Sequence, residues 1–299
     1  MGPLLFVLYI NDLVNCLPNT VTSKLFADDL KLYSELKGTA DCLNIDDALT
    51  RLSDYAKAWQ LIISFSKSYF IDISSSRHIS FDQVCCIDNV ELARVVELRD
   101  LGVGIDQRLT FSGHVTATVA RARQRMALLL RVFMKKDPHH LMMGFKSFVL
   151  PLLDYCSQVW SPHLVKDIVL IESVQRSFTK RIPGLRDFSY MDRLTKLGII
   201  TLERRRLESD LILCFKILNG LTCGPPEAFG LHLSDRRSRG HSLKLIIEHT
   251  KIDTRKYYFA NRVSKPWNSL PDELITSVNV HQFRVNLKQI NLDKYLIIK

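Results

Sequence analysis

Two adjacent aspartates, Asp28 and Asp29, stand between two short apolar runs at residues 21–27 and 30–33. Apolar runs that close on an acidic pair predict a short β-hairpin with the carboxylates at its tip. Two neighbouring carboxylates on one turn repel each other unless a cation lies between them. Mg²⁺ is the expected cation, because it takes one or two carboxylates together with substrate phosphates. The pair is therefore a candidate metal site for phosphoryl transfer.

An aspartate pair is also common in turns and at helix N-termini, so the pair alone is weak evidence for a metal site. The residues around it are more specific. Phe26 and Ala27 precede the pair, and residues 2–13 read GPLLFVLYINDL. Together these segments resemble the reverse transcriptases of non-LTR retrotransposons of the jockey and CR1 type. In that family the F/Y-A-D-D box is the palm hairpin that carries two catalytic aspartates. The resemblance thus implies catalytic and metal-binding roles for Asp28 and Asp29.

A second segment of this kind lies at residues 59–67, where WQLIISFSK fits most of the family's W-x-L-x-x-F-N-x-x-K pattern. Ser66 replaces the usual Asn of that pattern. The resemblance implies that Lys67 lies near the triphosphate of the incoming nucleotide. A solvent-exposed loop lysine explains Lys67 at least as well.

A third segment, residues 98–106, reads LRDLGVGID and resembles the family's D-L-G-V segment. The resemblance implies that Leu101 and Gly102 belong to a hairpin that holds the primer end. Glycine at positions 102 and 104 permits the close approach of a nucleic-acid strand. An ordinary tight turn explains these glycines equally well.

Later segments extend the resemblance to about residue 288, in the order in which the family uses them. Residues 147–160 resemble a P-x-L-E-Y-x-S-x-V-W box, and residues 171–176 resemble an L-E-x-V-Q-R box. No chemistry attaches to either box, and both are interpreted as helix-packing signatures. Residues 236–241 match a basic R-x-T-R-G-H loop, and residues 267–271 match a W-N-x-L-P turn.

The net charge of +10 is unevenly distributed, since residues 1–66 hold eight acidic and five basic residues. An acidic segment followed by a basic body is typical of a protein that handles a polyanion near bound metal. A solvated basic surface remains the alternative. The resemblance implies that the partners are an RNA template and an RNA–DNA duplex, with dNTP as the substrate of the intact enzyme. The candidate nucleic-acid-binding residues are Arg121, Arg123, Arg125, Lys135, Lys136, Arg236, Arg237 and Arg239.

Apolar periodicity predicts helices over residues 3–17 and 39–59 and from residue 114 onward. Asp137 followed by Pro138 predicts a capped start for a further helix. Short apolar runs predict strands at residues 61–65 and 69–73 and within 79–105.

These elements predict an α+β fold. With the resemblance, they indicate a partial polymerase palm of antiparallel strands and helices, followed by a mostly helical thumb and C-terminal region. The predicted domains are a partial reverse-transcriptase palm at residues 1–110, a helical thumb-like region at 111–185 and a basic C-terminal domain at 186–299.

Composition excludes several other classes of protein. Seven scattered cysteines without a C-x-x-C pair argue against a disulfide framework or zinc knuckle, and favour a reducing, intracellular compartment, nuclear or cytoplasmic. The apolar first ten residues lack the basic region of a signal peptide. No run reaches the roughly 18 apolar residues that a membrane span requires, so no membrane partner is expected.

The resemblance implies an RNA-directed DNA polymerase that uses two Mg²⁺ ions in the intact family. The family's first catalytic aspartate and its fingers lie upstream of the segment with which this sequence begins. We therefore expect an N-terminally truncated fragment that holds at most one Mg²⁺ loosely and is inactive alone. Two alternatives remain open, which are a non-catalytic nucleic-acid-binding remnant and a transposon relic without function.

Overall fold

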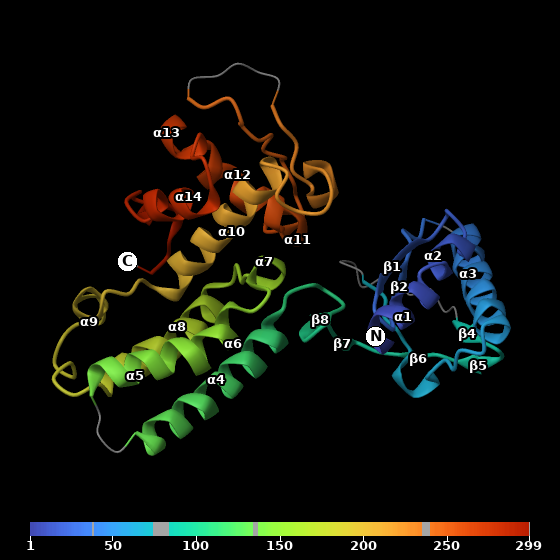
Figure 1. The fold of residues 1–299 in the computed structure, drawn as a ribbon, viewed down its shortest axis with the longest axis horizontal. Helices are drawn as coiled ribbons and strands as arrows, with labels where there is room; N and C mark the ends of the chain where they lie inside the picture. Colours follow the sequence, from blue (N-terminus) through green and yellow to red (C-terminus); the bar gives the residue numbers. More distant parts are fainter. Residues whose placement is uncertain (38, 74–83, 134–136, 235–239, 299) are drawn as a thin grey trace. The chain divides into compact units, whose positions relative to one another are not determined.

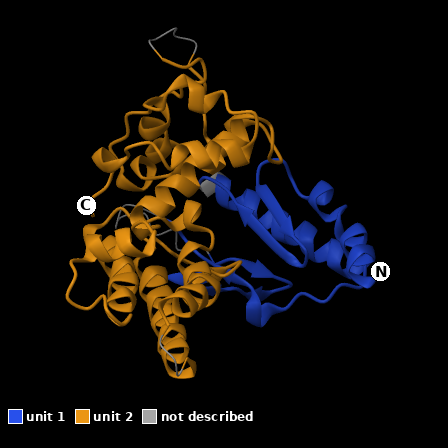
Figure 2. Ribbon diagram, turned by 60° about the vertical axis from the view of Figure 1, so that its left-hand side comes forward, with its two compact units in different colours: residues 1–98 blue, residues 99–299 orange. Residues whose placement is uncertain are grey.

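The computed structural model describes residues 1–37, 39–73, 84–133, 137–234 and 240–298. The chain forms two compact units, residues 1–98 (unit 1) and 99–299 (unit 2) (Figures 1 and 2). Unit 1 combines short two-stranded sheets with helices, whereas unit 2 is mostly helical. This mixture confirms the predicted α+β class. In the described ranges, no helix has both the length and the apolar character needed to cross a membrane.

Unit 1 is built around α3 (Thr39–Ala58), which confirms the helix predicted over residues 39–59. Ala48, Leu49 and Tyr55 on one side of α3 are buried, and neighbouring elements pack against that side. The other elements of unit 1 are α1 (Gly2–Ile10), α2 (Leu13–Cys16), β1 (Thr22–Phe26), β2 (Asp29–Tyr33), a 3-10 turn (Phe65–Lys67), β3 (Tyr69–Phe70), β4 (Cys86–Ile87), β5 (Val90–Glu91) and β6 (Ala93–Arg94).

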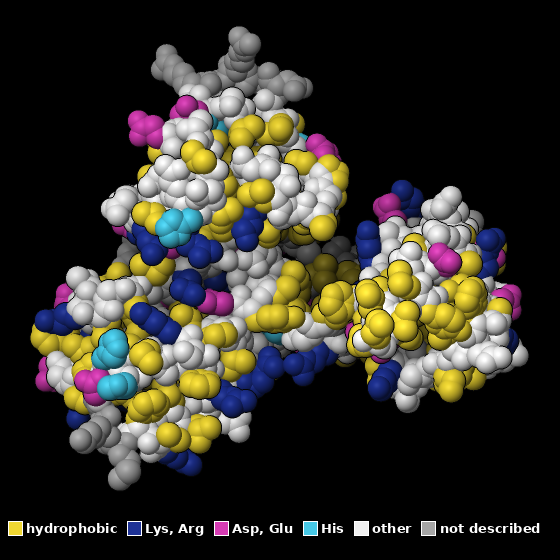
Figure 3. Space-filling model, viewed as in Figure 1, with side chains coloured by type: hydrophobic (Ala, Val, Ile, Leu, Met, Phe, Trp, Pro, Cys, Tyr) yellow, Lys and Arg dark blue, Asp and Glu magenta, His cyan; other side chains and the backbone are white. Residues whose placement is uncertain are grey.

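The helix predicted over residues 3–17 is interrupted, because Asn11 and Asp12 separate α1 from α2. Asn and Asp disfavour helix interiors, since their side chains compete for backbone hydrogen bonds. Only Ile10 of α1 is buried, and Leu4 and Leu8 remain 66% and 64% exposed. Figure 3 shows the hydrophobic side chains gathered over α1. Unit 1 therefore presents an apolar surface there.

The strand predicted at residues 61–65 is wrong. Gln60 takes a left-handed backbone conformation (φ 54°), and the amide of Leu61 donates back to the carbonyl of Ala56, which ends α3 in a tight reversal. Ser68 Oγ then donates to the carbonyl of Ser64 at 3.0 Å. These hydrogen bonds at both ends of the segment are thus local and do not come from a neighbouring strand.

Of the strands predicted further along, four short ones form in unit 1. The β3 strand pairs in parallel with β6, and β4 pairs with β5 across a turn at Asp88 and Asn89. Both turn residues have positive φ, as a two-residue hairpin with the twist of its strands requires. The Asp88 carboxylate accepts hydrogen bonds from Ser53 and Lys57, which ties this hairpin to α3.

Unit 2 contains two hydrophobic cores, and the first lies within residues 103–202. The helix predicted from residue 114 onward is confirmed as α4 (Ser112–Val132), and its apolar residues Val115, Val119, Ala122, Met126 and Leu129 are all buried in this core. The elements around this core are β7 (Glu97–Asp100, beginning in unit 1), β8 (Val103–Asp106), α4 (Ser112–Val132), α5 (Pro138–Gly144), a π-helical turn (Phe145–Val149), α6 (Leu150–Asp154), α7 (Ser157–Trp160), α8 (Val165–Lys180) and α9 (Tyr190–Leu197).

The predicted cap at Asp137 is also confirmed, since its carboxylate accepts the amide of His140 at 3.1 Å at the start of α5.

The second core lies within residues 211–292 and is centred on Phe215, Trp267 and Phe283. It is formed by α10 (Leu202–Leu218), a 3-10 turn (Pro226–Phe229), α11 (Asp253–Lys256), α12 (Phe259–Asn268), α13 (Asp272–Ile275), α14 (Val280–Leu287) and a 3-10 turn (Asp293–Tyr295). Helix α10 belongs to both cores, since Leu202 packs in the first and Phe215 in the second.

The box at residues 171–176 is a packing signature, as predicted. Glu172 is 1% exposed, and its carboxylate accepts the amides of Leu202 and Glu203 at the start of α10 and the hydroxyl of Tyr190. Gln175 donates to the same hydroxyl and to the carbonyl of Ile200. The box thus joins α8 to α9 and α10.

The box at residues 147–160 also serves packing. Trp160 is fully buried, and its Nε1 donates to the carbonyl of Tyr155 at 2.7 Å. The turn at residues 267–271 acts in the same way, because Trp267 Nε1 donates to the carbonyl of Leu243, and the Asn268 amide exchanges two hydrogen bonds with the backbone of Leu245.

Substitution of Glu172 by Gln tests the buried carboxylate. Burial raises the pKa of Glu172 above 4.5, so the unfolded chain releases this proton at lower pH than the folded chain does. Rising pH therefore lowers the free energy of unfolding of the wild type through this group. The Glu172→Gln variant lacks this contribution. Its free energy of unfolding, relative to that of the wild type, should therefore increase as the pH rises from 4 to 7.

Urea unfolding at both pH values measures this difference. Glu227→Gln is the control, because that carboxylate is exposed and makes no hydrogen bond in the described part of the chain. A constant difference between wild type and Glu172→Gln over this range would contradict the role given to Glu172.

Candidate catalytic and nucleic-acid-binding sites

The aspartate pair lies at the end of the β1–β2 hairpin. The strands pair antiparallel with Phe26 opposite Asp29, which leaves Ala27 and Asp28 as a two-residue turn. Asp28 lies in the turn and Asp29 begins β2, and both are exposed. Ala27 has a φ of 52°, a conformation that is unfavourable for a residue with a Cβ atom. The predicted hairpin therefore forms, with both carboxylates at a constrained tip.

Alternating leucines hold the hairpin in place. Leu25 and Leu30 are cross-strand partners, and both pack against the cluster of Ile10, Leu13 and Tyr55. Side chains alternate between the faces of a strand, so one face of the hairpin is anchored, while the residues between are exposed in β1 and Lys31 is half-buried in β2. The acidic tip thus sits on a packed base.

The donor set at the tip fits a hard cation, because carboxylate oxygens are ligands that Mg²⁺ prefers. Within the described ranges, no group of three or more His, Cys, Asp or Glu side chains is arranged to hold a metal ion. Asp28 and Asp29 therefore offer ligands for one ion without a third side chain from these classes. The catalytic role of the pair stays a prediction.

Lys67 ends the 3-10 turn of residues 65–67 and is exposed. Its side chain forms no ion pair or hydrogen bond within the part of the chain that the structure describes. The predicted place of Lys67 near a triphosphate therefore stays a prediction.

The segment predicted to hold a primer end forms the tight β7–β8 turn. Leu101 and Gly102 occupy it with φ values of 43° and 88°. Tyr155 lies against this turn, since its hydroxyl donates to the carbonyl of Leu101 at 2.9 Å and a Cβ atom at Gly102 would lie 3.4 Å from its ring. A side chain at position 102 would thus be strained by the positive φ, and its Cβ atom would contact the Tyr155 ring.

His114 supports the same hairpin from α4. The amide of Gly104 donates to His114 Nδ1 at 3.0 Å, and the imidazole ring packs 5.2 Å from Trp160. Burial lowers the pKa of His114, and the nearby Arg121 and Arg99 lower it further. The ring is therefore neutral at pH 7, which leaves Nδ1 free to accept a hydrogen bond.

Tyr155 and His114 were missed as positioning residues. The signal for Tyr155 was its place in the box at residues 147–160, whereas His114 carried no signal beyond its place at the start of a helical stripe. A hollow of about 250 Å³ between these two side chains is also lined by Arg99 and Arg121. Basic side chains therefore border the turn.

The three arginines of α4 that were predicted to bind nucleic acid, Arg121, Arg123 and Arg125, are exposed, and they do not form one row. Arg121 and Arg125 are four residues apart and share a face of the helix. Arg121 donates to Thr118 at 3.3 Å, whereas Arg123 donates to Ser173 of α8 at 2.8 Å. None of the three has an acidic partner among the described residues. Figure 3 shows basic side chains spread over α4 and the neighbouring hairpin.

The remaining predicted binding residues lie outside the described residues, and they are Lys135, Lys136, Arg236, Arg237 and Arg239.

Known proteins resemble parts of this chain. Over 192 residues, which are 62% of the chain, it is 28% identical to a probable RNA-directed DNA polymerase from the transposon X-element of Drosophila melanogaster. Over 170 residues, 54% of the chain, it is 26% identical to a probable RNA-directed DNA polymerase from transposon BS of the same organism. An uncharacterized protein of Caenorhabditis elegans is 25% identical over 127 residues, which cover 42% of the chain and 64% of that protein.

The chain spans about a fifth of the length of the two transposon polymerases, 21% of the first and 19% of the second. No protein-family model and no solved structure matches it. The relatives nevertheless agree with the resemblance predicted from the motifs. Two of the curated proteins similar to this chain are probable RNA-directed DNA polymerases of Drosophila transposons, at modest identity over 62% and 54% of its residues.

Proposed function

We propose that the chain is part of an RNA-directed DNA polymerase of a non-LTR retrotransposon, and that Asp28 and Asp29 are two of its catalytic carboxylates. The observation that carries this proposal is the β1–β2 hairpin, which presents the adjacent aspartates at an exposed tip in a chain similar to such polymerases. An aspartate pair on a packed hairpin is held in position before any ion or substrate arrives, as electrostatic stabilisation requires.

Asp28 and Asp29 would hold one Mg²⁺ through their carboxylate oxygens. When bound, such an ion neutralises charge that develops on a transferred phosphoryl group. The two carboxylates orient that ion on the tip, and the hairpin leucines keep the tip from moving away from it. Two-metal transfer needs carboxylates that reach both ions, and the described residues bring no third acid into a metal-holding group with this pair.

The basic residues of α4 and the β7–β8 turn would bind the RNA template and the RNA–DNA duplex. Arg121, Arg123 and Arg125 are exposed without acidic partners in the described ranges, so their charge is available to phosphates. The turn at Leu101 and Gly102 lets a strand approach its backbone closely. Such contacts read the backbone rather than the bases, so binding is independent of sequence.

A second candidate function is nucleic-acid binding without synthesis. It is favoured by the two-carboxylate donor set, which holds a single ion, and by the arginines, which need no metal to contact phosphate. The two functions predict the same binding and differ in nucleotide incorporation.

The first test concerns binding. Affinity for RNA–DNA duplex should fall steeply with salt, by a log–log slope of about −0.9 for each phosphate neutralised on B-form DNA. Substitution of Arg121, Arg123 and Arg125 by Gln should make this slope less steep by up to about 2.7 and weaken binding equally for all sequences. Fluorescence anisotropy at several salt concentrations measures both quantities.

The matched control replaces Lys180, Arg181 and Arg186 by Gln, which removes the same charge from exposed positions at and after the end of α8. Binding that stays flat with salt, or that falls equally in both triple variants, would overturn the role of α4.

The second test concerns metal binding. Mn²⁺ substitutes for Mg²⁺ as a probe, and water-proton relaxation reports its binding. We expect one weak site, with a dissociation constant on the order of a millimolar, as for the weakest carboxylate sites. The Asp28→Ala, Asp29→Ala variant should lose this site, whereas Asp46→Ala, Asp47→Ala, which removes another adjacent pair in unit 1, should keep it. Equal binding by both variants would contradict the assignment.

The third test concerns synthesis. The chain alone should not extend oligo(dT) on poly(rA) with Mg²⁺ or Mn²⁺, because a single ion on two carboxylates leaves the second ion of the transfer unsupported. Loss of one element that stabilises the transition state costs about two to three orders of magnitude in rate. Extension by the wild type that disappears only in the Asp28→Ala, Asp29→Ala variant would show that the chain assembles a working site alone.

A further inference from the structure

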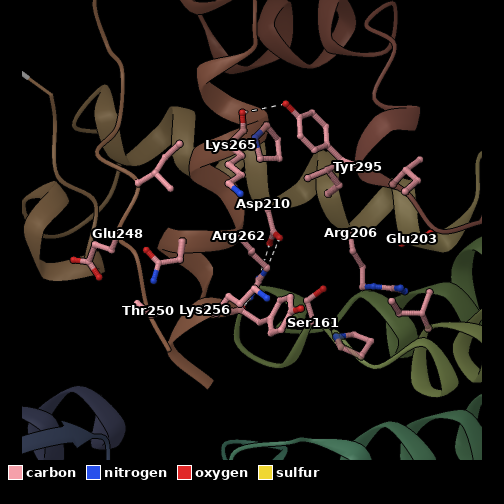
Figure 4. Close-up of a pocket in the computed structure, with 18 of the residues that line it drawn as sticks. Ser161, Glu203, Arg206, Asp210, Glu248, Thr250, Lys256, Arg262, Lys265 and Tyr295 are labelled. Atoms are coloured by element: carbon pink, nitrogen blue, oxygen red, sulfur yellow. Dashed lines mark hydrogen bonds and ion pairs between the residues drawn. The ribbon is translucent and has the colours of Figure 1, made fainter. Parts of the chain in front are cut away.

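Unit 2 contains a hollow of about 360 Å³ beside α10 and α12, whose lining shares no residue with that of the hollow at the β7–β8 turn. Side chains from both helices line it, together with Tyr257 after α11, residues 247–250 and Tyr295 near the end of the chain (Figure 4). Nothing in the proposed polymerase chemistry uses this hollow. Four basic and three acidic side chains line it. Which ligand the hollow can bind therefore depends on which of these charges are already paired with each other.

Arg206 is the unusual residue of this lining. It is 3% exposed, its Nη1 is buried without a hydrogen-bond partner, and it forms no ion pair among the described residues. Its neighbours on α10 are different, because Arg204 pairs with Glu208 and Arg205 pairs with Asp154. Figure 4 shows dashed lines between Asp210 and Arg262, whereas no such line reaches Arg206.

The acidic side chains of the lining are already engaged elsewhere. Asp210 is held by Arg262 through two contacts, of 2.8 and 3.0 Å. The Glu203 carboxylate accepts the amides of Ile297 and Ile298. The third acid, Glu248, pairs at 2.9 Å with an arginine, Arg255, that does not line the hollow.

Two lysines lie at the exposed edge of the same hollow. Lys256 and Lys265 line it, and neither pairs with a carboxylate in the described part of the chain. The lining thus holds three cationic side chains that form no ion pair with an acid of the described residues. Arg206 is deeply buried, and Lys256 and Lys265 lie at the rim.

A buried guanidinium without a partner is costly, because it loses hydration and gains no hydrogen bond in return. Arginine does not escape this cost by losing its proton, since it stays charged in proteins. Burial lowers the pKa of Arg206, and four acids within electrostatic range, Glu172 the largest contributor, oppose that shift. Arg206 Nη1 is thus left without a hydrogen-bond acceptor among the described residues.

We propose that this hollow binds a phosphate group, with Arg206 as the buried donor and Lys256 and Lys265 at the rim. The guanidinium fork matches the paired oxygens of phosphate. A terminal phosphate carries a charge of about −1.5 to −2 at neutral pH, which suits three cations without a direct ion pair better than the single charge of a carboxylate does. We further infer that this phosphate is the terminal phosphate of a nucleic-acid strand, and this part of the inference rests on the proposed function.

The first experiment uses inorganic phosphate as the probe and the full chain as the protein. Isothermal titration at constant ionic strength, with chloride as the replaced anion, should show one phosphate site. Arg206→Met should weaken it by about ten- to a hundredfold, as expected for loss of a charge-assisted hydrogen bond. Replacement of a buried charge by an apolar side chain of similar size is often tolerated, so this variant should still unfold cooperatively.

A second variant guards against a folding defect in the first. Lys256→Gln, Lys265→Gln changes only exposed side chains at the rim and should weaken phosphate binding while the unfolding midpoint without phosphate stays unchanged. Lys180→Gln, Arg181→Gln is the matched control and should bind phosphate as the wild type does. Absence of phosphate binding by the wild type, or equal binding by the wild type and both pocket variants, would overturn the proposal.

The second experiment identifies the source of the phosphate. Short RNA with a 5′-phosphate should bind more tightly than the same RNA with a 5′-hydroxyl, and Arg206→Met should abolish this preference. The triple Gln variant of α4 should bind both RNAs more weakly and still prefer the 5′-phosphorylated one. This result separates failure of the pocket from failure of the proposed function. Binding of inorganic phosphate without any preference for the phosphorylated RNA would overturn the nucleic-acid source.

Discussion

The structure of unit 2 depends on one buried carboxylate at the start of α10. Glu172 of α8 accepts two backbone amides there and the hydroxyl of Tyr190 from α9, so it joins three helices at one point. A buried carboxylate is tolerated only when donors surround it, and the positive end of a helix favours it further. Because α10 belongs to both cores, this contact also sets where its arginines and Asp210 lie relative to α12.

Local signals account for the elements that were predicted correctly. The Asp28–Asp29 hairpin, α3 and α4 follow from turn residues and apolar spacing, because the residues that define each element are neighbours in the chain. The strand predicted at residues 61–65 failed because an apolar run does not show whether a partner strand exists. The left-handed residue Gln60 and the serines that bond to nearby carbonyls decide that segment instead.

The candidate sites also divide into residues that the sequence predicted and residues that only the fold brings together. The aspartates were found from the sequence, because two adjacent acids within a family motif are visible without a fold. The side chains around the β7–β8 turn were not found from the sequence, because Tyr155 lies 54 residues along the chain from Leu101, whose carbonyl accepts its hydrogen bond. Arg206 is the clearest case. Three consecutive arginines look alike in the sequence, and only the packing of α10 leaves two of them paired and buries the third without a partner.

The division into two units separates the two chemical properties of this chain. The carboxylate pair is anchored by the small leucine clusters of unit 1, whereas the exposed arginines of α4 and the buried Arg206 depend on the two cores of unit 2. Each of these hydrophobic clusters lies within one unit, so a substitution inside a cluster removes packing from that unit. A polymerase needs both properties together, while a nucleic-acid-binding protein needs only those of unit 2.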